Sequence, residues 1–203
     1  MTSRGSNATS GADQALRQAK AALRRQIAAA LARMPAEARA RAAAEARARL
    51  AKQRVWQEAK WILFFAPLPG ELDVWPLAQM SLEAGKTVSL PRFDAAAGRY
   101  AAGRVKDLQR DLRVGRFGIR EPAPSCPRAP LNRLDLLLVP GVAFDPHGRR
   151  LGRGKGFYDQ LLAAVRGTTC GVAFDEQLVR QVPVGPHDVR LNCILTPTRW
   201  IEL

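Results

Sequence analysis

The chain has 203 residues, 47% of them hydrophobic and 25% charged, with a net charge of +14. These values predict one soluble globular domain with a sizeable core. No apolar run approaches the length of a membrane span, which excludes a transmembrane protein.

The N-terminal residues and the cysteines indicate the compartment. Residues 1–12 lack the apolar middle of a secretory signal. They contain Ser and Arg but no acidic residue, so a transit peptide stays open as an alternative. We expect a disordered tail over 1–12 and one domain over 13–203. Cys126, Cys170 and Cys193 show no CxxC spacing, which fits a reducing cytoplasm and argues against a zinc site.

The basic charge is concentrated near the N-terminus. Residues 1–60 hold 13 Lys or Arg and 4 Asp or Glu, so +9 of the +14 lies there. Much of this segment is rich in Ala and Arg, as in a solvated helix, and no aromatic residue precedes Trp56. Without aromatic residues for base stacking, a solvated helix face or a small-anion ligand is favoured over nucleic acid, which stays open as an alternative.

Two helices are expected first, over 13–33 and, after an interruption at Pro35, over 35–57. Lys20 and Arg24 are four residues apart, so both project from one side of the first helix. Their spacing alone favours two solvated charges.

A buried strand over 61–66 is followed by a loop that carries Glu71. Ligands of open α/β sheets bind beyond the carboxyl ends of strands, so this carboxylate is a candidate binding group. Its alternative role is capping or N-terminal charge for the next helix, over 73–84. A strand over 87–90, closed by Pro91 and Arg92, completes a βαβ unit.

The remaining segments are shorter. Strands, turns and loops are expected as follows: a hairpin strand over 98–105, a helical turn over 107–112, an ordered loop over 117–122, a surface loop over 122–130, a buried strand over 169–174, a helical turn over 175–179, a loop over 183–188 and a strand over 193–196. The alternation of strands and helices predicts a single-domain, three-layer α/β/α fold, Rossmann-like, with a mainly parallel twisted sheet and an N-terminal helical segment.

The most informative stretch runs from 134 to 165. A buried strand over 134–139 precedes a turn over 145–148, a basic glycine-rich loop over 149–156 and a helix over 157–165. Glycines let backbone N–H groups approach an anion, and the helix N-terminus offers unpaired donors, so this order predicts a phosphate-binding loop. The alternative is a basic surface turn. The loop matches neither GxxxxGK[ST] nor GxGxxG, so we expect a phosphate-binding loop of a different family.

Two carboxylates are candidate ligands of a hard cation. Asp159 lies one turn into the helix after the loop, where it could equally supply favourable N-terminal charge. Asp188 is the best candidate for a second ligand, and the adjacent His187 fits a surface histidine better.

These residues together resemble a known family. Residues 136–162, LLLVPGVAFDPHGRRLGRGKGFYDQLL, are similar to the signature of 5-formyltetrahydrofolate cyclo-ligases. The resemblance extends from about 14 to 196. It includes Lys20 and Arg24, the glutamate of GELD, GKTVSLPR at 85–92, FGIREP at 117–122 and the late segment from Phe174 to Asp188.

The resemblance implies an enzyme that uses ATP and Mg²⁺ to convert 5-formyltetrahydrofolate into 5,10-methenyltetrahydrofolate, with release of ADP and phosphate. It implies catalytic roles for Arg153 and Lys155 and metal ligation by Asp159 and Asp188. The implied ATP contacts are Lys20, Arg24, Arg150, Leu151, Gly152, Arg153, Gly154, Lys155, Gly156, Phe157 and Tyr158. The implied folate contacts are Ala66, Leu68, Glu71, Arg153, Gly154, Lys155, Gly156 and Phe157.

We accordingly expect small-molecule partners, no membrane, no nucleic acid and a monomeric cytoplasmic enzyme. Two alternatives stay open. One is a noncatalytic nucleic-acid-binding module on the same fold, and the other is phosphoryl transfer to a different small acceptor.

Overall fold

The computed structural model describes residues 5–115, 118–154, 157–185 and 188–203. The helices are α1 (Gly5–Ala32), α2 (Ala36–Ala51), α3 (Arg54–Glu58), α4 (Trp75–Glu83) and α5 (Phe157–Ala163), with 3₁₀ turns η2 (Leu131–Arg133) and η3 (Asp175–Gln177). The strands are β1 (Trp61–Leu63), β2 (Thr87–Asp94), β3 (Arg99–Val105), β4 (Leu112–Val114), β5 (Arg120–Pro122), β6 (Arg128–Ala129), β7 (Leu136–Pro140), β8 (Ala143–Phe144), β9 (Arg150–Leu151), β10 (Thr168–Val172), β11 (Cys193–Leu195) and β12 (Trp200–Glu202). None of the described helices is long and apolar enough to cross a bilayer.

Eight strands form the central sheet, in the order β12-β11-β10-β7-β1-β2-β3-β6. The five strands from β11 to β2 in this order run parallel, and β12, β3 and β6 pair antiparallel at the two edges. The predicted three-layer, mainly parallel fold is therefore confirmed. The expected βαβ unit is present as β1-α4-β2, with Trp61 in register with Thr87.

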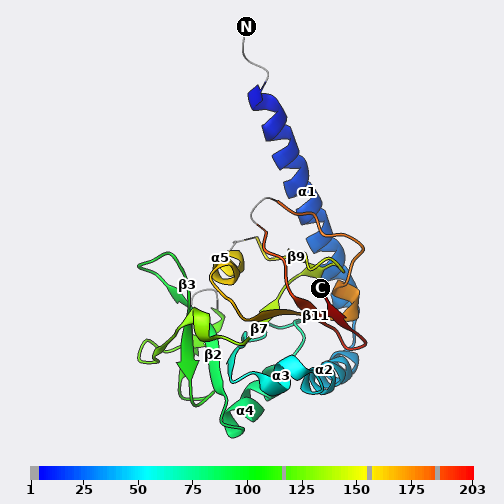
Figure 1. Ribbon diagram of the computed structural model, residues 1–203. Coiled ribbons are helices and arrows are strands. Elements are labelled where there is room, and N and C mark those ends of the chain that lie inside the picture. Colours follow the sequence, from blue (N-terminus) through cyan, green and yellow to red (C-terminus); the bar gives the residue numbers. More distant parts are fainter. Residues whose placement is uncertain (1–4, 116–117, 155–156, 186–187) are drawn as a thin grey trace.

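Alternate residues of the central strands face opposite layers of the protein. Leu136 and Leu138 of β7 pack in the cluster that includes buried residues of α2, α3 and α4. Leu137 and Val139 pack in the cluster that includes Leu161 of α5. Helices α2, α3 and α4 thus cover one face and α5 covers the other (Figure 1).

Helix α1 packs over the β8–β9 hairpin, and its N-terminal part projects from the body (Figure 1). Ile27 of α1 lies in a buried cluster with Ala143, Leu151 and Val182. The helix begins at Gly5, although a tail was expected through residue 12, because no proline interrupts this segment and its alanines favour helix. The division into a tail and one domain from residue 13 stays a prediction.

The second expected helix, 35–57, is wrong as a single element. It ends at Ala51 and a separate α3 begins at Arg54. The N–H groups of Lys52 and Gln53 turn back to the carbonyl oxygens of Arg49 and Leu50, and the Gln53 side chain also donates to the Arg49 carbonyl. This local cap ends the helix and lets Trp56 of α3 turn into the core.

Four further expectations need correction. The segment expected as a surface loop over 122–130 contains β6, which pairs with β3. Strand β2 continues past Pro91 to Asp94, because β3 pairs with it there and β1 pairs only as far as Ser89. The segment expected as a loop over 117–122 contains β5, which pairs with β4. The glycine-rich loop expected from residue 149 begins only after β9, which pairs with β8 and includes Arg150.

Candidate functional site

A cleft of about 680 Å³ opens where the parallel strands end. It is lined by Phe65 and Ala66 after β1, by Pro91 in β2, and by Pro140 and Gly141 at the end of β7. The carboxyl edge of a parallel sheet is where α/β proteins bind ligands, and this cleft lies there.

All predicted site residues with described side chains line this one cleft. They are Lys20, Arg24, Ala66, Leu68, Glu71, Arg150, Leu151, Gly152, Arg153, Gly154, Tyr158, Asp159 and Asp188. Lys155, Gly156 and His187 lie outside the described residues, as does the side chain of Phe157. The structure therefore brings predicted site residues from distant parts of the chain, as far apart as Lys20 and Asp188, into one cleft.

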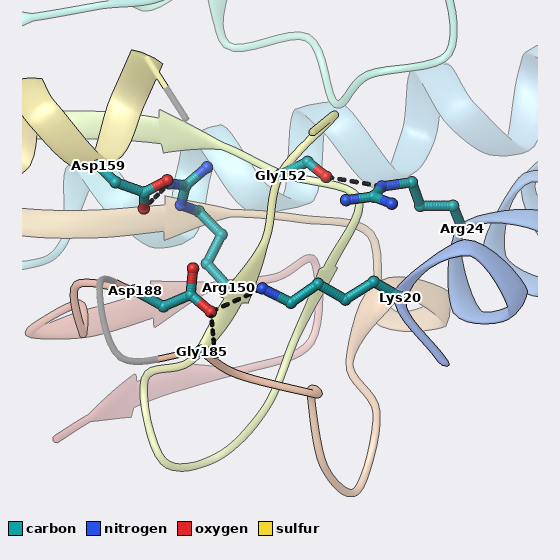
Figure 2. A network of polar contacts seen from close by, with 7 residues as sticks. All are labelled: Lys20, Arg24, Arg150, Gly152, Asp159, Gly185 and Asp188. Carbon is teal, nitrogen blue, oxygen red and sulfur yellow. Dashed lines mark hydrogen bonds and ion pairs between the residues drawn. The ribbon is translucent and has the colours of Figure 1, made fainter. Parts of the chain in front are cut away.

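Helix α1 closes one side of the cleft with the two cations whose spacing alone was uninformative. Lys20 Nζ donates to Asp188 Oδ2 at 2.8 Å, and Arg24 Nε donates to the carbonyl oxygen of Gly152 at 3.0 Å (Figure 2). Solvated side chains would make no such contacts. One helix thus holds both the loop before Asp188 and the glycine-rich loop.

The surroundings of Asp188 favour the ionised form of its carboxyl group. Its Oδ2 also accepts the N–H of Gly185 at 2.7 Å. Burial raises the pKa of the Asp188 carboxyl, but the hydrogen bonds from Lys20 and Gly185 and the nearby charges of Lys20 and Arg150 lower it more, so the net pKa lies below its ordinary value. The carboxylate remains ionised in the partly buried cleft.

Arg150 anchors the other acidic residue. Its Nη2 donates to Asp159 Oδ1 at 2.7 Å, and its side chain is 4% exposed (Figure 2). The guanidinium also lies 5.7 Å from the centre of the Tyr158 ring. Asp159 is in the first turn of α5, so it supplies favourable N-terminal charge at the same time as it contacts Arg150.

The two carboxylates fit the donor set of a hard cation. Within the described parts of the chain, one oxygen of Asp159 and one of Asp188 carry no hydrogen bond. Magnesium usually takes only one or two protein carboxylates and keeps several waters. No group of three His, Cys, Asp or Glu side chains that could hold a metal occurs among the described residues, so a cage built wholly of protein ligands is absent there.

The glycine-rich loop meets the loop after β1 across the cleft. Arg153 Nη2 donates to Glu71 Oε1 at 2.7 Å, and Glu71 Oε2 accepts the N–H of Leu68 at 3.0 Å. Both oxygens of Glu71 are thus engaged within the cleft wall. Asp73, rather than Glu71, accepts the N–H of Trp75 at the start of α4, which argues against the capping alternative for Glu71.

The backbone at Gly154 explains one glycine of the loop. Its φ is +98°, in a region that residues with a side chain rarely adopt, and its Cα faces the guanidinium of Arg24. Together with the contact of Gly152, this geometry argues against a simple surface turn.

Sequence reasoning did not assign nine residues that also line the cleft: Arg17, Phe65, Pro91, Tyr100, Ile119, Arg120, Glu121, Pro140 and Gly141. Six of them carry no charge, namely Phe65, Pro91, Tyr100, Ile119, Pro140 and Gly141. Pro91 and Glu121 belong to the GKTVSLPR and FGIREP motifs, which the sequence singled out without giving them a role. Burial also raises the pKa of the Tyr158 phenol above its ordinary value, so this group stays neutral.

Comparison with known proteins shows the family of this chain. Residues 16–197 match the model of the 5-formyltetrahydrofolate cyclo-ligase family. A 5-formyltetrahydrofolate cyclo-ligase of Mycolicibacterium smegmatis is 38% identical over 149 residues, which cover 68% of this chain and 73% of that protein. The Escherichia coli protein of the same name is 38% identical over 149 residues, covering 70% of this chain and 80% of the relative.

A solved structure shows the same fold. The structure of Aquifex aeolicus 5,10-methenyltetrahydrofolate synthetase superposes with a TM-score of 0.82 at 32% sequence identity. The superposition covers 91% of this chain and 92% of that one, so the likeness extends over nearly the whole fold.

Proposed function

The chain belongs to the 5-formyltetrahydrofolate cyclo-ligase family, a family of ligases, and we propose that it converts 5-formyltetrahydrofolate and ATP into 5,10-methenyltetrahydrofolate, ADP and phosphate. The observation that carries this proposal is the contact between Arg153 and Glu71. It joins the glycine-rich loop, assigned to ATP, to the loop assigned to the folate, so both substrates would meet in one cleft.

The formyl oxygen of the substrate is a poor leaving group, so the reaction must first convert it into a phosphate. The formyl oxygen of the substrate attacks the γ-phosphorus of ATP, the bond to the β-phosphate oxygen breaks, and ADP leaves. As the oxygen attacks, the N5 lone pair forms a double bond to the formyl carbon, so the intermediate is an N5-iminium phosphate. N10 attacks the formyl carbon and loses its proton, and the carbon–oxygen bond breaks to release phosphate.

This chemistry requires positioning and charge neutralisation rather than a protein nucleophile. Arg153 has a half-exposed guanidinium within the cleft, suited to the charge that develops on the transferred phosphoryl group. Lys155 is assigned the same task from the sequence. Lys20, Arg24 and the loop residues Arg150–Gly154, with Gly156, Phe157 and Tyr158, would hold the nucleotide.

Asp159 and Asp188 would hold Mg²⁺, each through the oxygen that carries no hydrogen bond among the described residues. When bound, the ion would neutralise phosphate charge. On the folate side, Glu71 would contact the N–H groups of the pterin, and Ala66 and Leu68 would pack against its ring. Cytoplasmic location and a monomeric state stay predictions.

The direct test measures ADP release with 5-formyltetrahydrofolate, ATP and magnesium, together with the absorbance of the methenyl product. We expect both to rise only when all three are present. ADP release with a different acceptor and no methenyl product would instead support the alternative of phosphoryl transfer to another small molecule. Tight, salt-sensitive RNA binding without turnover would support the nucleic-acid module.

A further inference from the structure

Glu121 of β5 is a buried carboxylate in the wall of the cleft to which the proposed reaction gives no role. The residue is 2% exposed, yet it lines the cleft beside Pro91, Tyr100 and Ile119. Ionisable residues are seldom buried so completely without a partner. Arg120 and Glu121 enter the cleft lining from β5, whereas Lys20 and Arg24, which are assigned to phosphate, enter it from α1.

Only one of the two carboxylate oxygens of Glu121 accepts a hydrogen bond from a described residue. Oε2 accepts the N–H of Phe93 at 3.1 Å, whereas Oε1 has no hydrogen-bond partner among the described residues. Burial raises the pKa of Glu121 more than the Phe93 N–H and the charges of Arg113 and Arg92 lower it. An unpaired buried oxygen on an ionisable group is costly, which indicates that a partner arrives with the ligand.

The surroundings hold the carboxylate in place. A Cβ atom built on Gly115 would lie 2.4 Å from Cδ and 2.6 Å from Oε2 of Glu121, so the glycine leaves only enough room for the carboxylate. Arg92, the nearest cation of β2, directs Nη1 to the carbonyl oxygens of Ala123 and Cys126. It therefore stabilises the loop after β5 without using Oε1.

We propose that Glu121 is a substrate-binding residue whose Oε1 accepts a hydrogen bond from an N–H group of the bound reduced folate. This inference rests on the proposed function. A carboxylate at this site would repel phosphate, whereas the reduced folate offers N–H donors on its ring system and at N10. Glu121 would supplement Glu71, whose two oxygens each accept one hydrogen bond already, from Leu68 and from Arg153, and so have less capacity left for the N–H groups of the ligand.

The variant Glu121→Gln separates this role from a structural one. Its amide oxygen can keep the hydrogen bond from Phe93, and this fixes the amide so that an NH₂ group replaces Oε1. Two donors would then face each other in the folate complex. We expect KM for 5-formyltetrahydrofolate to rise about 10-fold to 100-fold, as for the loss of a hydrogen bond to a charged group. KM for ATP should stay unchanged, and the thermal midpoint at neutral pH should not fall.

The matched control is Glu83→Gln, which makes the same chemical change at an exposed residue of α4 bonded to Gln79. Wild-type turnover combined with an unchanged KM for folate in Glu121→Gln would overturn the inference alone. A wild-type protein that neither binds nor converts 5-formyltetrahydrofolate would overturn the proposed function as well.

A second measurement does not depend on the variant folding. A crystal structure of the wild-type protein with 5-formyltetrahydrofolate should show a substrate nitrogen within hydrogen-bonding distance of Glu121 Oε1. A folate bound with only carbon atoms or acceptor oxygens near Oε1 would refute the assignment.

Discussion

Lys20 Nζ and Asp188 Oδ2 lie 2.8 Å apart although 168 residues separate them in the chain. This ion pair joins α1 to the loop before β11 at the cationic end of the cleft (Figure 2). Because both side chains are partly exposed, at 21% and 23%, the pair is accessible to a ligand, and under the proposed function we expect Lys20 to exchange partners when the nucleotide phosphate binds.

Lys20→Met should therefore impair nucleotide binding more than folding. We expect KM for ATP to rise about 10-fold, the loss of one charge-assisted contact, and the free energy of unfolding to fall by about 1 kcal/mol. Arg54→Met is the matched control, since it removes a cation from the exposed pair with Glu58. Equal effects of the two variants on KM for ATP would contradict the assignment of Lys20.

The pair of Arg150 and Asp159 should matter for stability because the guanidinium is almost fully buried. Removal of one partner leaves an unpaired charge, so Arg150→Met should lower the free energy of unfolding by about 3 kcal/mol. In urea unfolding, Arg150→Met combined with Asp159→Asn should lose less than the sum of the single losses. Strictly additive losses would show that the two residues are not coupled.

Arg153→Ala should separate catalysis from folding. Its side chain is 58% exposed and contacts Glu71, so its removal should leave the thermal midpoint nearly unchanged. The loss of a cation that stabilises transition-state charge should lower kcat about 100-fold or more. Arg166→Ala, at an exposed residue outside the cleft, serves as the control. Wild-type kcat in Arg153→Ala would refute the role given to the loop.

Glu121 should make stability depend on pH. Its pKa in the folded protein is raised above the ordinary value of 4.5, so the folded state holds the proton more tightly than the unfolded state does. Its stabilising contribution is complete below about pH 4.5 and is lost as the pH rises through the raised pKa. Urea unfolding from pH 4 to 8 should show wild type losing stability relative to Glu121→Gln. A difference that does not vary with pH would contradict this.

Local patterns in the sequence were sufficient for much of the fold. The apolar run before Pro140 is the central strand β7, and the segments on either side of α4 form the predicted parallel pair. The FGIREP segment was misjudged because β5 is short and pairs only with β4, a partner that composition does not reveal. The helix break before α3 depends on the Gln53 cap, which helix propensity alone does not indicate.

The sequence by itself determined the layered α/β architecture, the glycine-rich loop and the family, because hydrophobic periodicity and motif spacing are local properties. Only the tertiary structure decided that Lys20 pairs with Asp188, that Arg150 is a buried partner of Asp159 rather than a loop residue, and that Glu121 lies half-satisfied in the cleft. Burial and ion pairing depend on which distant segments the sheet order brings together, and that order is a property of the whole packed chain.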